Sequence, residues 1–231
     1  VAAGTYLGLI SINKPVTLLG ANAGVCADGS VVRGPESLLL PGVSNALDGI
    51  LLYVTASGVT IDGFFLEGDN LQPGDGQPAF ELGTEADVGN IVANGSFDDT
   101  GPYPFVHVRA VSVLNNVIRS ANDVAVNLYN GGSDPVSDQN AIVCNSFTNI
   151  AGDNTLSPGG PYSRVGVLLY NDTYASVDQN ILGTAVSPVN IGVQTGNNYR
   201  PLAGGSASMN GNTAVAQTVA LFHNLHYQNA S

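Results

Sequence analysis

A short turn pattern recurs along this chain and constrains its fold more than any other feature. An apolar strand is followed by Gly or Asn, then any residue, then an apolar residue, as in VTIDGFF, AIVCNSF and ASVDQNIL. Gly and Asn adopt a positive φ at the least cost, so each copy predicts a sharp bend that returns the chain to one core. The predicted bends are Gly63, Gly95, Asn116, Asn145, Asn180 and Asn212, and the apolar residues two positions later are Phe65, Phe97, Ile118, Phe147, Leu182 and Ala214.

A second set of segments alternates with the first and also keeps its place in each copy. VAVNLYN and VGVLLYN align residue by residue, so Val124, Val126 and Leu128 are expected to match Val165, Val167 and Leu169. Their final asparagines, with those of IGVQTGN and VALFHN, predict a second ladder at Asn130, Asn171, Asn197 and Asn224.

Successive copies lie mostly about 30 residues apart, a period that fits one coil of a solenoid. An antiparallel sandwich also has regular turn signals, but it does not require two columns that stay in place. We therefore predict an all-β, single-stranded right-handed parallel β-helix of about seven or eight coils, forming one domain over residues 1–231.

Composition supports this class and limits the partners. Charged residues make up 10% of the chain and lysine occurs once, at Lys14, which disfavours exposed helices and favours strands with tight turns. A net charge of −12 would repel phosphate backbones, so nucleic acid is not an expected partner. No apolar run has the length of a membrane span. Neither a signal peptide nor an initiator Met is present, so we expect a mature or trimmed chain.

The beginning of the chain resembles a known family. AAGTY, ISINKPVTLLGANAG and RGPES, at residues 2–6, 10–24 and 33–37, are similar to the first coils of secreted right-handed parallel β-helix proteins of the pectin-lyase-like superfamily. The resemblance implies a secreted, extracellular or cell-surface β-helix. It does not select a function, because this fold hosts lyases, hydrolases, epimerases, tailspikes, adhesins and structural proteins.

The catalytic sets of that superfamily are largely missing here. The resemblance to galacturonan hydrolases would imply Asn-x-Asp, Asp-Asp, Gly-His-Gly and Arg-x-Lys groups, and the chain has only the pair Asp98 and Asp99. The Asp-Gln pairs of SDQN and VDQN resemble those of pectin esterases but occupy repeat turns, where a structural role is expected. We therefore predict no catalytic residue, with a uronate-processing enzyme as the alternative.

Two weaker binding sites are also predicted. Carboxylates around a Gly-rich turn could hold Ca²⁺, the alternative being a solvated acidic loop; these are Asp62, Glu67, Asp69 and Asp75. Exposed aromatic rings on a flat sheet could stack on a polysaccharide, the alternative being packing between coils; these are Tyr53, Tyr129 and Tyr170.

Two distance predictions follow from the repeat. Cys26 and Cys144 lie about four coils apart, roughly 19 Å at about 4.8 Å per coil, so we expect no disulfide between them. Asp98 and Arg119 each follow the apolar residue of a turn, so we expect them to be neighbours.

The coil ends point to a function. An uncovered first coil, with the strand of Ile10, Ile12 and Leu18, would leave backbone groups unpaired and core side chains in water. We expect residues 219–222 of another subunit to cover it head to tail, or a capping segment of the same polypeptide. The predicted function is a structural or adhesive protein that can act as a filament subunit, with an enzyme or a glycan-binding module as alternatives.

Overall fold

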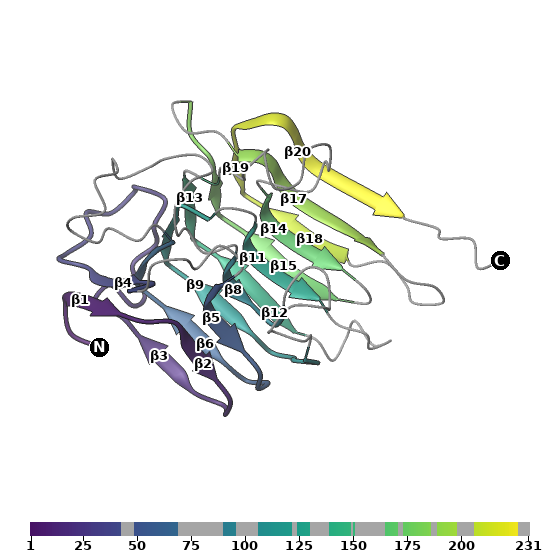
Figure 1. Cartoon of the computed structure of the whole chain (residues 1–231). Coiled ribbons are helices and arrows are strands. Elements are labelled where there is room, and N and C mark those ends of the chain that lie inside the picture. The colour runs from purple at the N-terminus through teal and green to yellow at the C-terminus, as the bar shows by residue number, and fades with distance from the viewer. Residues whose placement is uncertain are drawn as a thin grey trace.

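The computed structural model describes residues 1–42, 49–68, 90–95, 106–121, 124–129, 139–148, 150, 165–170, 173–185, 189–197 and 206–225. Every regular element within these ranges is a β-strand, and the strands form three sheets (Figure 1). No helix in this part of the chain is long and apolar enough to span a membrane.

Within each sheet, adjacent strands are three elements apart in the sequence. Sheet A contains β1 (Gly4–Leu7), β4 (Ser37–Leu40), β7 (Phe65–Glu67), β10 (Val117–Arg119), β13 (Ser146–Thr148), β16 (Ile181–Leu182) and β19 (Thr213–Ala214). Sheet B contains β2 (Ile10–Ile12), β5 (Ile50–Val54), β8 (Asn90–Ala93), β11 (Val124–Tyr129), β14 (Val165–Tyr170), β17 (Val189–Asn197) and β20 (Ala216–Leu225). Sheet C contains β3 (Thr17–Leu19), β6 (Thr60–Asp62), β9 (Ser112–Leu114), β12 (Asn140–Val143), β15 (Tyr174–Asp178) and β18 (Ser206–Asn210).

The chain visits sheets A, B and C in turn, and all described pairings are parallel. We call one A–B–C round a pass, so that β1 to β3 form the first pass and β10 to β12 the fourth. Figure 1 shows the passes stacked from the purple N-terminal strands to the yellow β20. This arrangement confirms the all-β, parallel-strand prediction and is compatible with a parallel β-helix.

The strand register follows the alternation seen in the sequence. Val126 lies opposite Val167 and Leu128 opposite Leu169, as the matched segments predict. In sheet C, Ile61, Val113, Ile142 and Val177 form one row of fully buried side chains. In sheet A the corresponding row is Leu66, Ile118, Phe147 and Leu182.

Two predicted positions of the turn pattern need correction. Leu66 is fully buried and occupies the row assigned to Phe65, which is half-buried, because the bend at Gly63 falls one residue earlier than the asparagine of later copies. Gly95 follows β8, which pairs with β5 and β11, so this glycine belongs to the end of a sheet B strand. Ala214 is exposed in the last sheet A strand, and Phe97 lies outside the described residues.

Candidate functional site

The corner between sheets C and A carries the most regular polar structure of the described chain. After each strand of sheet C from β6 to β18 the backbone takes a positive φ, at Gly63, Asn115, Cys144, Gln179 and Gly211. Gly63 is the predicted bend, but the other four residues each precede a predicted asparagine, so in those copies the left-handed conformation belongs to the residue before the asparagine. The asparagines recur at this corner because of the hydrogen bonds that their side chains form.

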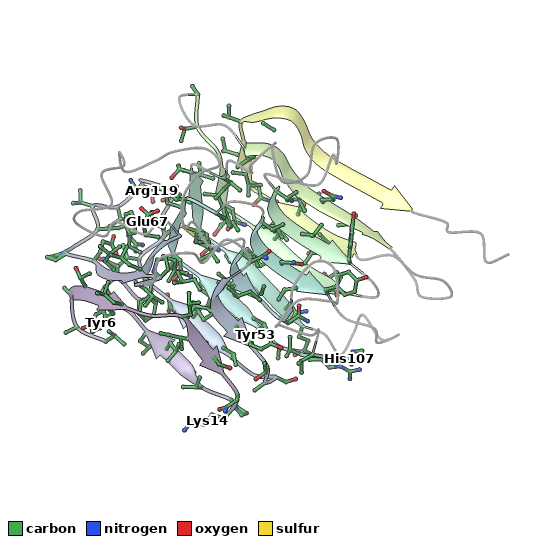
Figure 2. All side chains as sticks on the ribbon, viewed as in Figure 1. Tyr6, Lys14, Tyr53, Glu67, His107 and Arg119 are labelled. Atoms are coloured by element: carbon green, nitrogen blue, oxygen red, sulfur yellow. A yellow bond between two sulfur atoms is a disulfide. The ribbon has the colours of Figure 1, made fainter. Side chains whose placement is uncertain are left out.

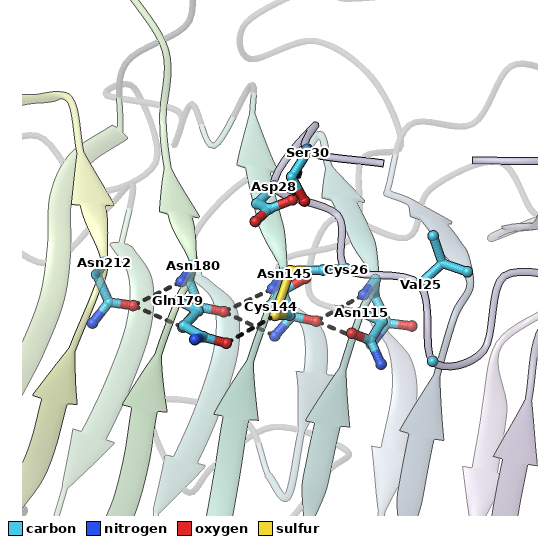
Figure 3. Close-up of a disulfide and its surroundings, with 12 residues drawn as sticks. Val25, Cys26, Asp28, Ser30, Asn115, Cys144, Asn145, Gln179, Asn180 and Asn212 are labelled. Carbon is cyan, nitrogen blue, oxygen red and sulfur yellow. Dashed lines mark hydrogen bonds between the residues drawn. A yellow bond between two sulfur atoms is a disulfide. The ribbon is translucent and has the colours of Figure 1, made fainter. Parts of the chain in front are cut away.

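Asn116, Asn145, Asn180 and Asn212 form a hydrogen-bonded row along this corner. Figure 3 labels the last three of them. The Oδ1 atom of Asn145 accepts from the backbone N–H of Asn116 at 2.9 Å and from its Nδ2 at 3.2 Å. Asn180 and Asn212 repeat the arrangement for Asn145 and Asn180. Each amide therefore satisfies backbone groups that would otherwise be buried without partners.

The row ends in the second pass, where the equivalent position is Phe64. Its backbone N–H donates to Oδ1 of Asn116 at 2.9 Å. The phenyl side chain has no amide of its own, so the row stops here. Gly63, which has no side chain, contributes a backbone bend at this corner.

The second predicted ladder is only partly described and is not in one register. Asn130 and Asn171 lie outside the described residues. Asn197 lies opposite Leu225, and Asn224 lies opposite Gly196, so these two asparagines are one position apart. The pairing of β17 with β20 shifts register between Val189 and Ile191, because β20 contains one extra residue there, as in a β-bulge.

Asn94 has a bridging role that the turn pattern did not identify, because Gly95 beside it fitted the motif. Its Nδ2 donates to the carbonyl oxygens of Val106 and Tyr129 at 2.9 and 2.7 Å, and its Oδ1 accepts from the N–H of Tyr129 at 2.9 Å. The side chain is fully buried.

Cys26 and Cys144 form a disulfide, with their Cα atoms 4.9 Å apart, so the prediction that they do not bond is wrong. Cys144 belongs to the corner that follows β12 in the fourth pass, as the repeat predicts. The error concerns residues 21–36, which we call the strap. The strap leaves the first pass and runs along the corner across later passes, so counting coils overestimates the distance (Figure 3).

The strap places a hydrogen-bond donor on the carbonyl of each left-handed residue it crosses. The N–H of Asn22 donates to the carbonyl oxygen of Gly63 at 3.2 Å, and the N–H of Ala27 to that of Cys144 at 2.9 Å. Between them, Nη1 of Arg33 donates to the carbonyl oxygen of Asn115 at 2.7 Å. One excursion thus caps the corners of the second, third and fourth passes.

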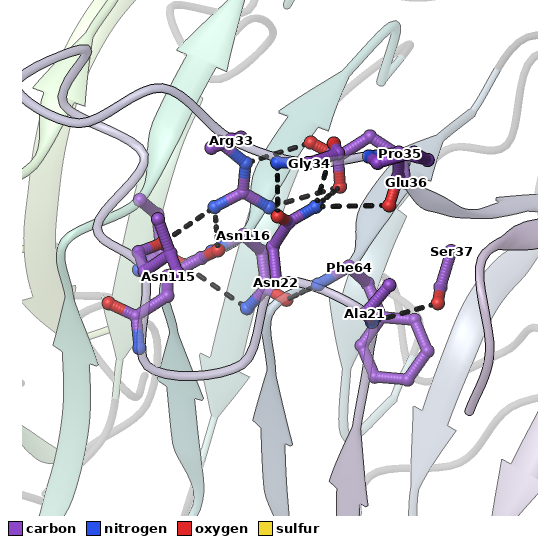
Figure 4. Close-up of polar contacts among 12 residues, drawn as sticks. Ala21, Asn22, Arg33, Gly34, Pro35, Glu36, Ser37, Phe64, Asn115 and Asn116 are labelled. Atoms are coloured by element: carbon purple, nitrogen blue, oxygen red, sulfur yellow. Dashed lines mark hydrogen bonds and ion pairs between the residues drawn. The ribbon is translucent and has the colours of Figure 1, made fainter.

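Polar contacts hold the two ends of the strap together (Figure 4). Arg33 pairs with Glu36, with Nε 2.8 Å from Oε1, and its Nη1 also reaches the carbonyl of Val25 at 2.7 Å. Asn22 donates to Glu36 at 2.8 Å and accepts from the N–H of Gly34 at 2.7 Å. At the tip, hydrogen bonds from the hydroxyl and the N–H of Ser30 lower the pKa of Asp28.

The two predicted acidic residues that lie in the described part of the chain, Asp62 and Glu67, are on different sheets and each contacts other partners. Asp62 on sheet C accepts from Nδ2 of Asn115 at 2.8 Å and from the N–H of Gly24 at 3.1 Å. Glu67 on sheet A is fully buried beside Arg119, with Oε2 2.5 Å from Nη2 (Figure 2). Asp69 and Asp75 lie outside the described residues. Within the described part of the chain, no three His, Cys, Asp or Glu residues form a group able to hold a metal ion.

Arg119 therefore pairs with Glu67, which lies directly opposite it in the register of sheet A. The guanidinium of Arg119 also lies 5.3 Å from the ring centre of Phe65. The predicted neighbour Asp98 lies outside the described residues.

The three candidate tyrosines do not form an exposed column. Tyr129 and Tyr170 lie opposite each other with ring centres 6.0 Å apart, but they are 6% and 0% exposed. Tyr53 lies in the row of Ala93 and Asn127, two positions away from that of Tyr129. Stacking on a sugar requires an open ring face, which Tyr129 and Tyr170 do not offer; both pack in one buried cluster, as the alternative expected.

Comparison with protein-family models, with curated proteins and with solved structures gives no match to this chain.

Proposed function

We propose that this chain is a secreted, non-catalytic structural or adhesive protein with a right-handed parallel β-helix of the pectin-lyase-like kind. In this proposal its molecules associate head to tail, the first pass of one copy resting on the last pass of another. The observation that carries the proposal is the exposed apolar surface of the first pass.

Large apolar side chains are exposed at both ends of the described stack. In the first pass, Leu7 is 62% exposed, Leu19 48%, Tyr6 40% and Ile10 39%. At the opposite end, Met209 is 41% exposed although its row in sheet C is otherwise a buried core row. Grouped apolar exposure of this kind is typical of a surface that another molecule covers.

The backbone at the two ends is also complementary. β1, β2 and β3 are the edge strands at one end of the three sheets, and β18, β19 and β20 are those at the other. Free strand edges are templates for pairing, and a contact between unlike ends repeats without closing, so it produces a fibre.

The register within the molecule specifies how the ends would meet. Following the paired rows from pass to pass puts Tyr6 in the row of Ala214. The same procedure puts Leu18 in the row of Met209. A second copy placed in this register would therefore continue two core rows across the junction.

The disulfide supports the proposed location. Disulfides persist in oxidising compartments such as the extracellular space and are rare in reducing ones. A secreted protein is therefore the natural context for the Cys26–Cys144 bond. The alternative functions, polysaccharide processing or glycan binding, gain no support from the described candidate residues.

Sedimentation velocity over a range of concentrations, with electron microscopy of the same samples, tests the proposal. We expect fibres whose fraction rises with concentration, and strong loss of association in Ile10→Glu. The matched control is Val32→Glu, because Val32 is 96% exposed but lies on the strap instead of the end strands. The proposal fails if the native chain stays monomeric at its highest soluble concentration, or if further residues of the native polypeptide cover the first pass.

A further inference from the structure

We propose that the Cys26–Cys144 disulfide is a reducible latch, which fastens the strap, and through it the first pass, to the fourth pass. A dithiol reductant would open the latch and free both.

The first step is the weakness of the strap without its covalent bond. Of residues 21–36, all of them described, only Asn22 and Ala27 are buried. Val31 and Val32, near the tip, are 56% and 96% exposed. The strap therefore buries little apolar surface against the later passes, and its hold depends on a few hydrogen bonds and the disulfide.

The second step is the weak packing of the first pass itself. All four residues of β1 are exposed, as are two of three in β2 and two of three in β3. Among the described strands, those of the first pass pair on one side alone, with β4, β5 and β6. Few buried contacts and exposed backbone hydrogen bonds are features of segments that open locally at low free-energy cost.

The disulfide ties both weakly held segments, the strap and the first pass, to the buried interior of the stack. The strap is separated from the end of β3 by one residue, and Cys144 lies beside Asn145 of the buried asparagine row. With the disulfide closed, the end of the first pass is tied to the interior of the stack. With the disulfide open, the hydrogen bonds of the strap and the pairing with the second pass must hold it alone.

The chemistry of opening is ordinary thiol–disulfide exchange. Both cysteines are partly exposed, so a reductant reaches them from the corner. One thiolate of the dithiol attacks a protein sulfur, forming a mixed disulfide and releasing the other cysteine as a thiolate, which takes up a proton. The second thiol of the reductant then displaces the remaining cysteine, leaving two protein thiols and an oxidised, cyclic reductant.

The consequence for assembly rests on the proposed function. The first pass carries the apolar end surface, so release of the latch would disorder that surface and stop head-to-tail growth. Closure and opening of the latch can be measured on dilute monomers, and so independently of whether the chain assembles.

Hydrogen exchange with mass spectrometry, on the dilute full chain with and without dithiothreitol, tests the latch. We expect amides of β1, β2 and β3 and of the strap to exchange about tenfold faster or more after reduction, while those of β11 and β14 stay unchanged. Cys26→Ser should show the fast exchange without reductant and no response to it.

Two outcomes would overturn the latch. Faster exchange confined to the strap would mean that the first pass does not depend on it. Equal acceleration in β11 and β14 would mean that the disulfide stabilises the whole fold instead of one end. Sedimentation of the same samples at high concentration then reports on the proposed function separately: a latch that opens in a chain that never assembles leaves the latch standing and the assembly refuted.

Discussion

Oδ1 of Asn180 accepts two hydrogen bonds from Asn145, one from its backbone N–H at 2.9 Å and one from its Nδ2 at 3.0 Å. Nδ2 of Asn145 also donates to the carbonyl oxygen of Val113 at 2.8 Å. The side-chain amide of Asn145 thus connects its own corner to the corner of the next pass, at Asn180. It also reaches strand β9 of the preceding pass, which contains Val113. Because these groups are buried, their loss cannot be compensated easily by water.

Asn145→Ala should therefore destabilise the protein by about 2–4 kcal/mol, since it leaves several buried groups of neighbouring residues unpaired. Asn210→Ala is the matched control: Asn210 is exposed on β18, and its loss should change stability by less than about 0.5 kcal/mol. Urea unfolding of both variants gives the comparison. Similar midpoints would show that the asparagine row adds little stability.

The left-handed corner at Gln179 provides a test of backbone strain. Its φ is 56° and its side chain is exposed, so substitution changes the backbone preference more than the packing. Gln179→Gly should be more stable than Gln179→Val by about 2 kcal/mol, because a β-branched residue resists this conformation. Thermal unfolding of the two variants would decide, and equal stability would contradict the assigned bend.

Gly63 and Gly58 separate the cost of a positive φ from the cost of blocking the strap. Their φ values are 79° and 73°, but a Cβ on Gly63 would lie 2.0 Å from the backbone nitrogen of Ala23, whereas one on Gly58 meets Pro15 Cβ at 3.7 Å. Gly58→Ala should cost about 1–2 kcal/mol from conformation alone. Gly63→Ala should cost about 2–3 kcal/mol more, because the strap must move. Chemical denaturation measures both, and equal losses would show that the strap yields freely.

The ion pair between Arg119 and the buried carboxylate of Glu67 is expected to contribute to the stability of the fold. Arg119→Met should destabilise the protein by about 2–4 kcal/mol, because it removes the guanidinium that lies against the buried carboxylate. The double variant Glu67→Leu with Arg119→Leu should recover much of that loss, since it removes both charges. A double variant as unstable as Arg119→Met in urea unfolding would indicate that packing around the pair, and not the charge, sets the cost.

The repeated parts of this fold were predictable, because they depend on local patterns. Strand alternation predicted the matched rows of β11 and β14, and the recurring asparagines marked the residues that form the row at the C–A corner. The exact bend residue was not predictable in the same way. Asn115, Cys144 and Gln179 adopt the left-handed conformation although two of these residue types do not favour it, because the row beside them fixes the chain.

The parts that were missed are non-local. Nothing in the repeat distinguishes a turn that stays in its own pass from the strap, which travels along the stack to Cys144. The tyrosines matched the pattern of exposed aromatics, but Tyr129 and Tyr170 are buried, and burial is decided by what covers a sheet. Gly95 fitted the turn motif, yet pairing of β8 with β5 placed it after a sheet B strand.

The sequence separation of 118 between Cys26 and Cys144 imposes an order of events on folding. During synthesis the N-terminal part of a chain is available first, but here its covalent closure must wait until the corner after β12 exists. Until then Cys26 is a free thiol on an unfinished structure, able to exchange with disulfides of other molecules. Correct oxidation consequently serves as a record that four passes have stacked in register, and a mispaired or unpaired Cys26 would mark chains in which they have not.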